Sequence, residues 1–200
     1  MGLGVPETLG GYRVLERLGG GADAELFKAR RDDGTVVCIK RLHPNLSDDP
    51  MFEQRFEREL KLAQELRHRN IVEVSSHGHE EGYYFVMEYI DGPSLEVLLG
   101  AGVLSPPLVI YIGVELCRAF GFLHRTDPET GRKPTIHSDV TPHNILLGRD
   151  GGVKLSDFGL AKAISRTGAE TITQARGKVT YLSPEQWMEQ PVGSSTDLFS

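Results

Sequence analysis

The chain has 200 residues, of which 39% are hydrophobic and 25% are charged, an ordinary globular composition. This length suits one large domain or two small lobes and is sufficient to bury a hydrophobic core. The formal net charge is -6 and the sequence shows no basic stripe, which argues against nucleic acid and anionic membranes as partners.

The cysteines and the N-terminus bear on location. Cys38 and Cys117 are far apart and form neither a disulfide framework nor a metal-ligand spacing, so we expect a reducing, cytoplasmic location. The N-terminus lacks the charged start and apolar core of a signal peptide, and Pro6 stands where a myristoylation signal carries Ser or Thr. No uninterrupted apolar run reaches about 18 residues, so we expect no membrane-spanning segment.

The first ninety residues are rich in predicted strands. Short runs such as YRVLERL, AELFKAR, TVVCIKRL and YYFVMEYI are separated by Gly, Asp or Asn turns. One helix is predicted among them, over roughly residues 50–67. Its apolar face consists of Phe52, Phe56, Ala63 and Leu66.

Three features of this region could carry chemistry. In LGGGADAEL, Gly19 and Gly21 would let backbone amides approach a phosphate, although an ordinary glycine-rich hairpin also explains them. Lys40 ends the strand VVCIK and shares one face with Cys38, yet a lysine at a strand end can simply extend into solvent. Glu59 lies on the apolar face of the predicted helix, where a carboxylate needs a partner such as Lys40 unless it is half-exposed at the edge.

From Ser94 the chain is predicted to be mainly helical. Ser105 followed by Pro106 is typical of a helix start. The apolar stripe of this helix consists of Val109, Ile112, Leu116, Phe120 and Leu123. The polar stretch RTDPETGRKPT comes next, and we expect a solvated loop there.

Three oxygen donors follow on two loops. Asp139 and Asn144 lie in IHSDVTPHNILL, and Asp157 lies in SDFG after the short strand VKLS. Mg²⁺ prefers a few hard oxygens completed by phosphate and water, so Asn144 and Asp157 would suffice as protein ligands. Asp139 would then orient, or take a proton from, an attacking hydroxyl. A DFG tripeptide alone is common, so the order of the motifs decides their interpretation.

That order is the glycine-rich loop, the strand lysine, the helix glutamate, H-x-D-x-x-x-x-N, DFG and S-P-E. From Tyr12 to its last residue the chain therefore resembles a eukaryotic-like protein kinase, most similar to bacterial serine/threonine kinases. The resemblance implies an α+β, two-lobed fold: a strand-rich N-lobe with one main helix, over about residues 12–90, and a helical C-lobe over about 94–200. The helices expected after TDLFS are absent, so we expect either a fragment of a longer chain or an incomplete C-lobe. Residues 1–11 would form an N-terminal extension.

The resemblance also implies an activity and its site residues. The γ-phosphate of ATP would pass, with Mg²⁺, to a Ser or Thr hydroxyl of a protein substrate, with Asp139 as catalytic base and Asn144 and Asp157 as metal ligands. Lys40, steadied by Glu59, would hold the α- and β-phosphates of ATP in the cleft. Further nucleotide contacts would come from the phosphate-covering loop Leu18–Leu26 with Gly19 and Gly21, from the gatekeeper Met87, from the backbone of Glu88 and Ile90, and from Leu26, Cys38 and Leu146 around the adenine ring.

Ser138 departs from the family pattern in a way that bears on regulation. It replaces an arginine that grips a phosphorylated activation loop in the family, so the electrostatic reason for ordering by phosphate is absent. Thr171 and Thr173 lie between DFG and S-P-E and are the expected autophosphorylation sites, with only a modest effect on activity. Asp197 matches the family's buried aspartate that ties down the backbone of the catalytic loop.

Thr141 and Lys178 form a second departure. Thr141 replaces a lysine that steadies the γ-phosphate, and Lys178 stands where the family's G-T-x-x-Y carries threonine. We expect the two side chains to have exchanged places, with Lys178 supplying the cation beside Asp139. The alternative is two unrelated losses, with Lys178 in solvent.

Two other functions fit parts of the pattern. A small-molecule phosphotransferase also uses H-x-D-x-x-x-x-N, but YLSPEQ is typical of a platform for protein substrates. A pseudokinase would bind ATP, or act as an interaction module, without turnover. The intact Lys40, Asp139, Asn144 and Asp157 argue against a pseudokinase.

Overall fold

The computed structural model of the chain describes residues 6–21, 24–44, 52–80, 82–157 and 179–200. Thr171, Thr173 and Lys178 therefore lie outside the described residues. The chain divides into two compact units, the N-terminal unit (residues 1–64 and 73–89) and the C-terminal unit (residues 65–72 and 90–200). Each unit has a hydrophobic core of its own.

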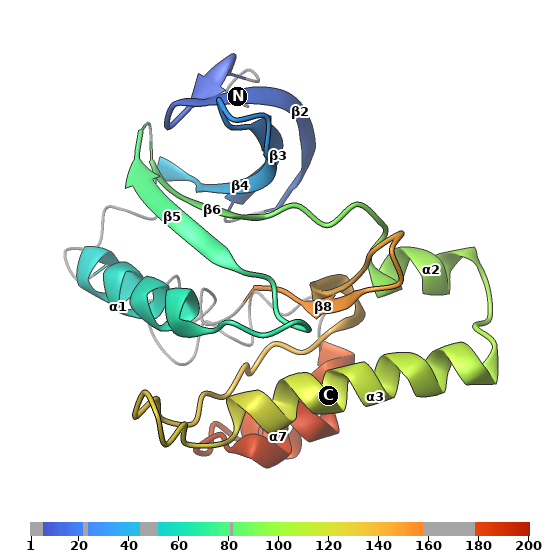
Figure 1. The fold of residues 1–200 in the computed structure, drawn as a ribbon. Helices are drawn as coiled ribbons and strands as arrows, with labels where there is room; N and C mark the ends of the chain where they lie inside the picture. The colour runs from blue at the N-terminus through green and yellow to red at the C-terminus, as the bar shows by residue number, and fades with distance from the viewer. Residues whose placement is uncertain (1–5, 22–23, 45–51, 81, 158–178) are drawn as a thin grey trace. The chain divides into compact units, whose positions relative to one another are not determined.

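A curled six-stranded sheet forms most of the N-terminal unit (Figure 1). Its spatial order is β1-β2-β3-β4-β6-β5, and all neighbouring strands are antiparallel. The short Gly- and Asp-containing turns of the sequence connect most of these strands, as expected for antiparallel neighbours. The strands are β1 (Thr8–Leu9), β2 (Tyr12–Gly20), β3 (Ala24–Arg30), β4 (Val36–Leu42), β5 (Val74–His79) and β6 (Tyr83–Glu88).

The two faces of this sheet differ in what they carry. Side chains alternate along each strand, so Phe27 of β3 and Ile39 of β4, both fully buried, share the core face. Leu26, Cys38 and Lys40 consequently lie on the opposite face. The alternation that the sequence predicted for VVCIK is confirmed, and it leaves one face of the sheet to the candidate site residues.

Helix α1 (Phe52–Glu65) is the main helix of the N-terminal unit and confirms the helix predicted over this region. Phe52 and Phe56 are fully buried, and their rings lie 5.4 and 5.0 Å from the ring of Tyr83 on β6. Glu53 in the first turn suits the positive end of the helix dipole. Packing of the phenylalanines, four residues apart, fixes which face of α1 meets the sheet.

In the described residues, the C-terminal unit consists of a longer helix, several shorter helices and a two-stranded hairpin. The apolar core includes Leu123, Val153 and Leu155, all almost fully buried, and a parallel bridge between Ile71 and Leu155 ties residues 65–72 to the hairpin. The elements are α2 (Leu95–Ala101), α3 (Pro106–Leu123), the 3-10 turn η2 (Pro142–Asn144), β7 (Ile145–Leu147), β8 (Val153–Leu155), the 3-10 turn η3 (Val179–Tyr181), α6 (Pro184–Trp187) and α7 (Ser194–Phe199).

Helix α3 begins as predicted and buries most of its predicted stripe, namely Ile112, Phe120 and Leu123 with Leu116 half-buried, but it departs at Val109. Ser105 is its N-cap and a proline follows in the first turn, as the sequence indicated. Val109, expected in the apolar stripe, is 53% exposed, whereas Glu115 is buried. Glu115 is compensated because its Oε2 accepts a hydrogen bond from Asn70 Nδ2 at 2.7 Å and its Oε1 pairs with Arg118.

The same helix bears on the expected lack of a membrane segment. In the part of the chain that the structure describes, one helix, α3, is both long enough and apolar enough to cross a membrane, judged by length and composition alone. Core helices of soluble proteins pass the same test. Ile112, Ala119, Phe120 and Leu123 of α3 are buried within the C-terminal unit.

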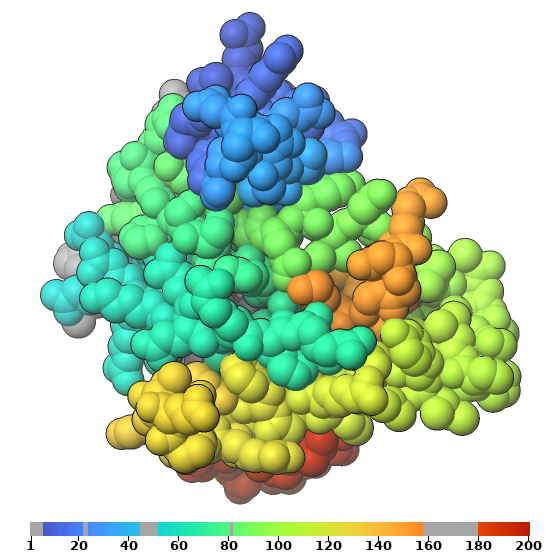
Figure 2. All heavy atoms as spheres, viewed as in Figure 1, coloured from blue at the N-terminus to red at the C-terminus, as the bar shows by residue number. Residues whose placement is uncertain are grey.

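The loop of residues 125–135 lies at the surface (yellow in Figure 2), but it is more than the solvated connection that its sequence suggests. Arg132 is buried, and its Nη2 donates to the carbonyl oxygen of Phe122 at 2.7 Å. Its Nη1 lies 3.4 Å from the carbonyl oxygen of Leu123, and its guanidinium stacks over the Phe122 ring at 4.3 Å. Arg132 therefore satisfies carbonyls that the end of α3 leaves without helical partners.

A glycine substitution tests how tightly the β7–β8 hairpin is held. A Cβ at Gly92 would lie 1.8 Å from the carbonyl oxygen of Leu147, and backbone hydrogen bonds of Leu147 to Pro93 and of Arg149 to Asp91 keep the two segments together. Gly92→Ala should therefore lower the free energy of unfolding by about 2 kcal/mol, as overpacking does.

The matched control is Gly100→Ala, in α2, where an added Cβ meets nothing within 4 Å. Because alanine is a better helix former than glycine, this change should raise the free energy of unfolding by up to about 1 kcal/mol. Both values come from denaturant unfolding. Equal effects of the two substitutions would contradict the described contact at Gly92.

Candidate functional site

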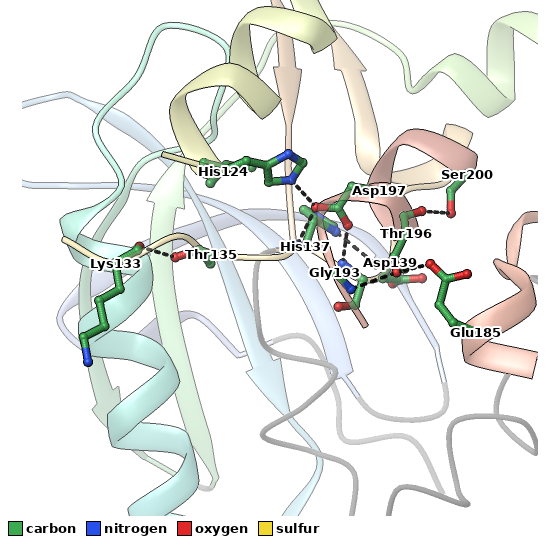
Figure 3. Close-up of polar contacts among 12 residues, drawn as sticks. His124, Lys133, Thr135, His137, Asp139, Glu185, Gly193, Thr196, Asp197 and Ser200 are labelled. Atoms are coloured by element: carbon green, nitrogen blue, oxygen red, sulfur yellow. Dashed lines mark hydrogen bonds and ion pairs between the residues drawn. The ribbon is translucent and has the colours of Figure 1, made fainter. Parts of the chain in front are cut away.

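A single buried carboxylate organises the catalytic-loop region of the C-terminal unit (Figure 3). Asp197 on α7 accepts hydrogen bonds from the backbone N–H of His137 at 2.9 Å and of Ser138 at 2.7 Å. Its Oδ2 also lies 2.8 Å from Nε2 of His124, at the end of α3. Asp197 is 2% exposed, and these donors replace the water that the carboxylate loses on folding. The structure therefore places Asp197 where the sequence resemblance expected it.

The hydrogen bonds of His137 define its protonation state. Nε2 lies 2.8 Å from the carbonyl oxygen of Ser156 and must carry a proton, while Nδ1 accepts from the N–H of Asp139 at 3.2 Å. Both nitrogens are therefore satisfied by the neutral ring. Burial lowers the pKa of His137, with opposing contributions from the Ser156 carbonyl and from Asp197, Asp139 and Asp157.

Asp139 and Asn144 are held together by the side-chain amide of Asn144. Its Nδ2 donates to the backbone carbonyl of Asp139 at 2.8 Å and to Oδ2 of the Asp139 carboxylate at 3.0 Å. The five-residue spacing can close because η2 begins with Pro142 and the Asn144 N–H donates to Thr141 O at 2.9 Å. The two residues that the sequence assigned to the catalytic loop thus meet in space.

Ser156 brings the third predicted oxygen donor to the same place. The Ser156 N–H and hydroxyl both donate to the backbone carbonyl of Asn144, at 2.8 and 3.1 Å. Asp157 follows directly, with a positive φ of 64° that side-chain-bearing residues rarely adopt. Ser138 is also left-handed, at φ 67°. Such conformations are costly and persist where the surrounding contacts impose them, as they do at functional sites.

Buried oxygen atoms without partners point to a ligand at this loop. Within the described residues, Oδ1 of Asn144, Oγ1 of Thr141 and Oγ of Ser138 are buried and accept or donate no hydrogen bond. An unsatisfied buried polar atom is costly, and native proteins rarely retain one without a ligand, ion or water. Because Nδ2 of Asn144 is engaged with Asp139, Oδ1 is left as a hard oxygen suited to Mg²⁺.

Five of the predicted nucleotide contacts of the N-terminal unit lie on one face of its sheet. Directly opposed residues of neighbouring strands share a face, and the register pairs Gly19 with Leu26, Leu26 with Lys40, and Cys38 with Met87. These five residues therefore form one continuous surface across β2, β3, β4 and β6, although they come from distant parts of the sequence.

Two further predicted contacts involve Glu88 and Glu59. The Glu88 N–H donates to Glu73 O at 2.9 Å, so a nucleotide would be offered the carbonyl of Glu88 rather than its amide. Glu59 is half-buried on α1, which fits both the partnered carboxylate and the half-exposed edge position that the sequence left open. Its ion pair with Lys40 stays a prediction.

Three contacts around the site were not foreseen from the sequence. Gln186 of α6 donates from Nε2 to the backbone carbonyl of Ser138 at 2.8 Å. Glu185 accepts from the hydroxyl of Thr196 at 2.6 Å. His124 contacts Asp197. The capping motif S-x-x-Q at Ser183 was the one available signal, since it predicts the helix that carries Gln186.

Comparison with known proteins identifies the class. The protein kinase domain family matches residues 12–200. The chain belongs to this family, and the α+β, kinase-like fold expected from the sequence is confirmed.

Three bacterial relatives illustrate the match. The chain is 37% identical to the "Probable serine/threonine-protein kinase SCO3848" of Streptomyces coelicolor over 98% of its length, and 36% identical to the serine/threonine-protein kinase PrkC of Bacillus subtilis over 88%. It is also 35% identical to the tyrosine-protein kinase MasK of Myxococcus xanthus over 97%. The chain spans 29%, 27% and 32% of these three proteins, so less than a third of each.

A solved structure supports the same conclusion. The PknI kinase domain of Mycobacterium tuberculosis, in the form of a point mutant, aligns with a TM-score of 0.74 at 26% identity. The alignment covers 98% of this chain and 72% of that one. The structural alignment and the family match over residues 12–200 both include residues of the two units.

The buried neutral His137 should make stability depend on pH. Its folded pKa lies below the unfolded value of about 6.5, so between the two values the unfolded chain binds one more proton than the folded chain. The free energy of unfolding should therefore fall as the pH drops below about 6.5, with a contribution of up to about 1.4 kcal/mol per pH unit.

Denaturant unfolding from pH 7.5 to 5.5, for the wild type and for His137→Phe, measures this contribution. The variant will be less stable throughout, because it loses two hydrogen bonds, but its curve should be flatter. A wild-type curve no steeper than that of the variant would contradict the assignment of His137 as buried and neutral.

Proposed function

We propose that this chain is the catalytic region of a serine/threonine protein kinase that transfers the γ-phosphate of ATP to a protein hydroxyl with Mg²⁺. The observation that supports the proposal is the set of hydrogen bonds that join Asn144 to Asp139, and Ser156, the residue directly before Asp157, to Asn144. Family membership supports the use of ATP and a divalent metal in general. The choice of Ser or Thr rather than Tyr rests on the sequence pattern, since one relative carries a tyrosine-kinase name.

Asn144 and Asp157 would hold the metal. The residues fit it, because Oδ1 of Asn144 is a buried oxygen without a partner in the described chain and Asp157 adds a carboxylate. Among the described residues no group of three or more His, Cys, Asp or Glu side chains forms a metal cluster, which agrees with an ion completed by phosphate and water. A bound Mg²⁺ would neutralise charge on the transferring phosphate.

Asp139 would act as the catalytic base. Asn144 Nδ2 fixes one carboxylate oxygen at 3.0 Å, so the carboxylate is oriented before a substrate binds. A half-buried carboxylate in this position can accept the proton of an attacking hydroxyl or align that hydroxyl for attack.

The nucleotide contacts of the proposal begin with Lys40 and Glu59. Lys40 would bind the α- and β-phosphates and Glu59 would hold the lysine in place. The shared sheet face described above supports this arrangement, since it puts Lys40 beside apolar neighbours suited to an adenine ring. The other contacts are Leu18, Gly19 and Gly21 for the phosphates, Leu26, Cys38 and Leu146 for the ring, Met87 as gatekeeper, and the backbone of Glu88 and Ile90.

Regulation and location complete the proposal. Thr171 or Thr173 would be the site of autophosphorylation, with a modest effect because Ser138 carries no positive charge to bind the phosphate. We propose a cytoplasmic location, in keeping with Cys38 and Cys117, which form no disulfide with each other.

The direct test incubates the purified protein with labelled ATP, Mg²⁺, a generic protein substrate and, separately, a set of small hydroxyl compounds. Label in protein Ser or Thr supports the proposal. Label in small compounds alone would indicate a small-molecule phosphotransferase, and ATP binding without any label a pseudokinase.

The catalytic assignments predict two severe variants. Asp139→Asn removes the base and Lys40→Met removes the cation on the phosphates, so each should lower kcat by at least about a thousandfold, since each loses transition-state charge or geometry. Circular dichroism should show an unchanged fold. Undiminished turnover in either variant would refute the mechanism as assigned.

The exchange of Thr141 and Lys178 is the next prediction. The hydroxyl of Thr141 is buried and without a partner in the described residues, which supports a ligand or side chain next to it. A cation placed there by Lys178 would contribute about 3 kcal/mol, so Lys178→Thr alone should slow transfer by about a hundredfold. Thr141→Lys alone should also be impaired, because two ammonium groups would repel each other.

The double variant Thr141→Lys with Lys178→Thr restores the family arrangement and should recover much of the lost activity. Recovery distinguishes an exchange from two independent losses, whose effects would add. A double variant no more active than Lys178→Thr would count against the exchange.

A further inference from the structure

The peptide bond that leads into Asp139 is held at both ends. Its carbonyl oxygen, which belongs to Ser138, accepts a hydrogen bond from Nε2 of Gln186 at 2.8 Å. Its N–H, which belongs to Asp139, donates to Nδ1 of His137 at 3.2 Å. Because a peptide unit is planar, fixing both groups fixes the direction from which the chain enters the Cα of Asp139. That direction sets where the carboxylate of Asp139 can reach.

Ser138 needs this support because its backbone is strained. Its φ of 67° lies in the left-handed region, which is unfavourable for a residue with a side chain. The N–H of Ser138 donates to Oδ1 of Asp197 at 2.7 Å, so Asp197 and Gln186 hold the two sides of the residue. Both restraining side chains come from helices outside the catalytic loop, α7 and α6.

Gln186 is itself fixed, and by its other amide atom. Its Oε1 accepts from the N–H of Ser183 at 3.1 Å, while its own N–H donates to the Ser183 hydroxyl at 3.4 Å, which makes a capping box at the start of α6. The acceptor half of the amide therefore caps α6 and the donor half reaches Ser138. A side chain that has only an acceptor or only a donor cannot make both contacts.

We propose that Gln186 is a positioning residue for Asp139: it holds the Ser138 carbonyl and so orients the catalytic base. The proposal rests on the proposed function of Asp139. It also gives the chain a way to order its catalytic loop through neutral hydrogen bonds, since Ser138 offers no charge to bind a phosphate.

The discriminating variant is Gln186→Glu. A glutamate keeps the acceptor for the Ser183 N–H, so the capping box survives, but it has no N–H for the Ser138 carbonyl. We expect kcat to fall by about tenfold to a hundredfold, as for a misplaced catalytic group, with the KM for ATP and the unfolding midpoint nearly unchanged. If Gln186 serves only as a helix cap, this variant should behave as the wild type.

Two controls separate the lost donor from other effects. Gln190→Glu adds the same charge at an exposed position four residues away and should leave kcat unchanged. Gln186→Met removes the donor without adding charge, so it should lower kcat as Gln186→Glu does, although it also loses the cap. A normal kcat in Gln186→Met would overturn the proposal.

An activity-independent measurement keeps this proposal distinct from the proposed function. Hydrogen exchange of the Ser138 and Asp139 amides should be faster in Gln186→Glu and Gln186→Met than in the wild type and Gln190→Glu. Unchanged exchange in both Gln186 variants overturns the proposal. If the wild type transfers no phosphate at all, the proposed function fails, while the exchange rates still decide whether Gln186 holds this peptide bond.

Discussion

The buried carboxylate of Asp197 is the interaction on which the C-terminal unit depends. It binds the N–H groups of His137 and Ser138 and the imidazole of His124, all of which lie far from Asp197 in the sequence. A buried carboxylate without such donors would be strongly unfavourable. If the segments that carry these groups separated while Asp197 stayed buried, its carboxylate would lose the donors that compensate its burial. One side chain on α7 thereby fixes both the end of α3 and the start of the catalytic loop.

From Asp197 a continuous series of hydrogen bonds runs to the candidate metal ligands. His137 reaches the Ser156 carbonyl, Ser156 reaches the Asn144 carbonyl, and Asn144 reaches Asp139. Each residue in the series uses both its backbone and its side chain, which leaves little freedom for the loop to rearrange. The few atoms left over are oxygens without partners, and they are the atoms that a ligand would complete. Order in the surroundings and unsatisfied atoms at the centre are what a preorganised site requires.

Much of the fold could be predicted from the sequence because strand faces and helix starts depend on local patterns. Alternation along VVCIK placed Lys40 on the correct face, and Ser105 before a proline marked the start of α3. The error in α3 has a physical cause: Val109 fits the apolar period as well as the residues that are buried, and nothing in the sequence shows that Asn70 and Arg118 would compensate a buried Glu115.

Contacts between distant segments were not predicted either, because the sequence does not show which side chains meet in space. A hydrogen bond from a side-chain amide to a backbone carbonyl produces no periodic pattern in the sequence. The role of Gln186 at Ser138 therefore could not be predicted, and only its part in a helix cap could. The family pattern supplied Asp197, but neither composition nor spacing would have paired it with His124. The sequence thus predicted candidate site residues, and the structure was needed to show which residues hold them in place.

The connection after α3, residues 125–135, has a consequence for how this chain can vary. Its tip is a turn in which Asp127 accepts hydrogen bonds from the N–H groups of Glu129 and Thr130, and these two residues face solvent. Extra residues or a fluorescent label at the tip would leave the packing of the C-terminal unit intact. Shortening the connection so that Arg132 is lost would remove the donor to the carbonyl of Phe122, near the end of α3, and leave the carbonyl of Leu123 to the N–H of Thr135 alone. The connection should therefore tolerate added residues at its tip but not the removal of Arg132 at its base.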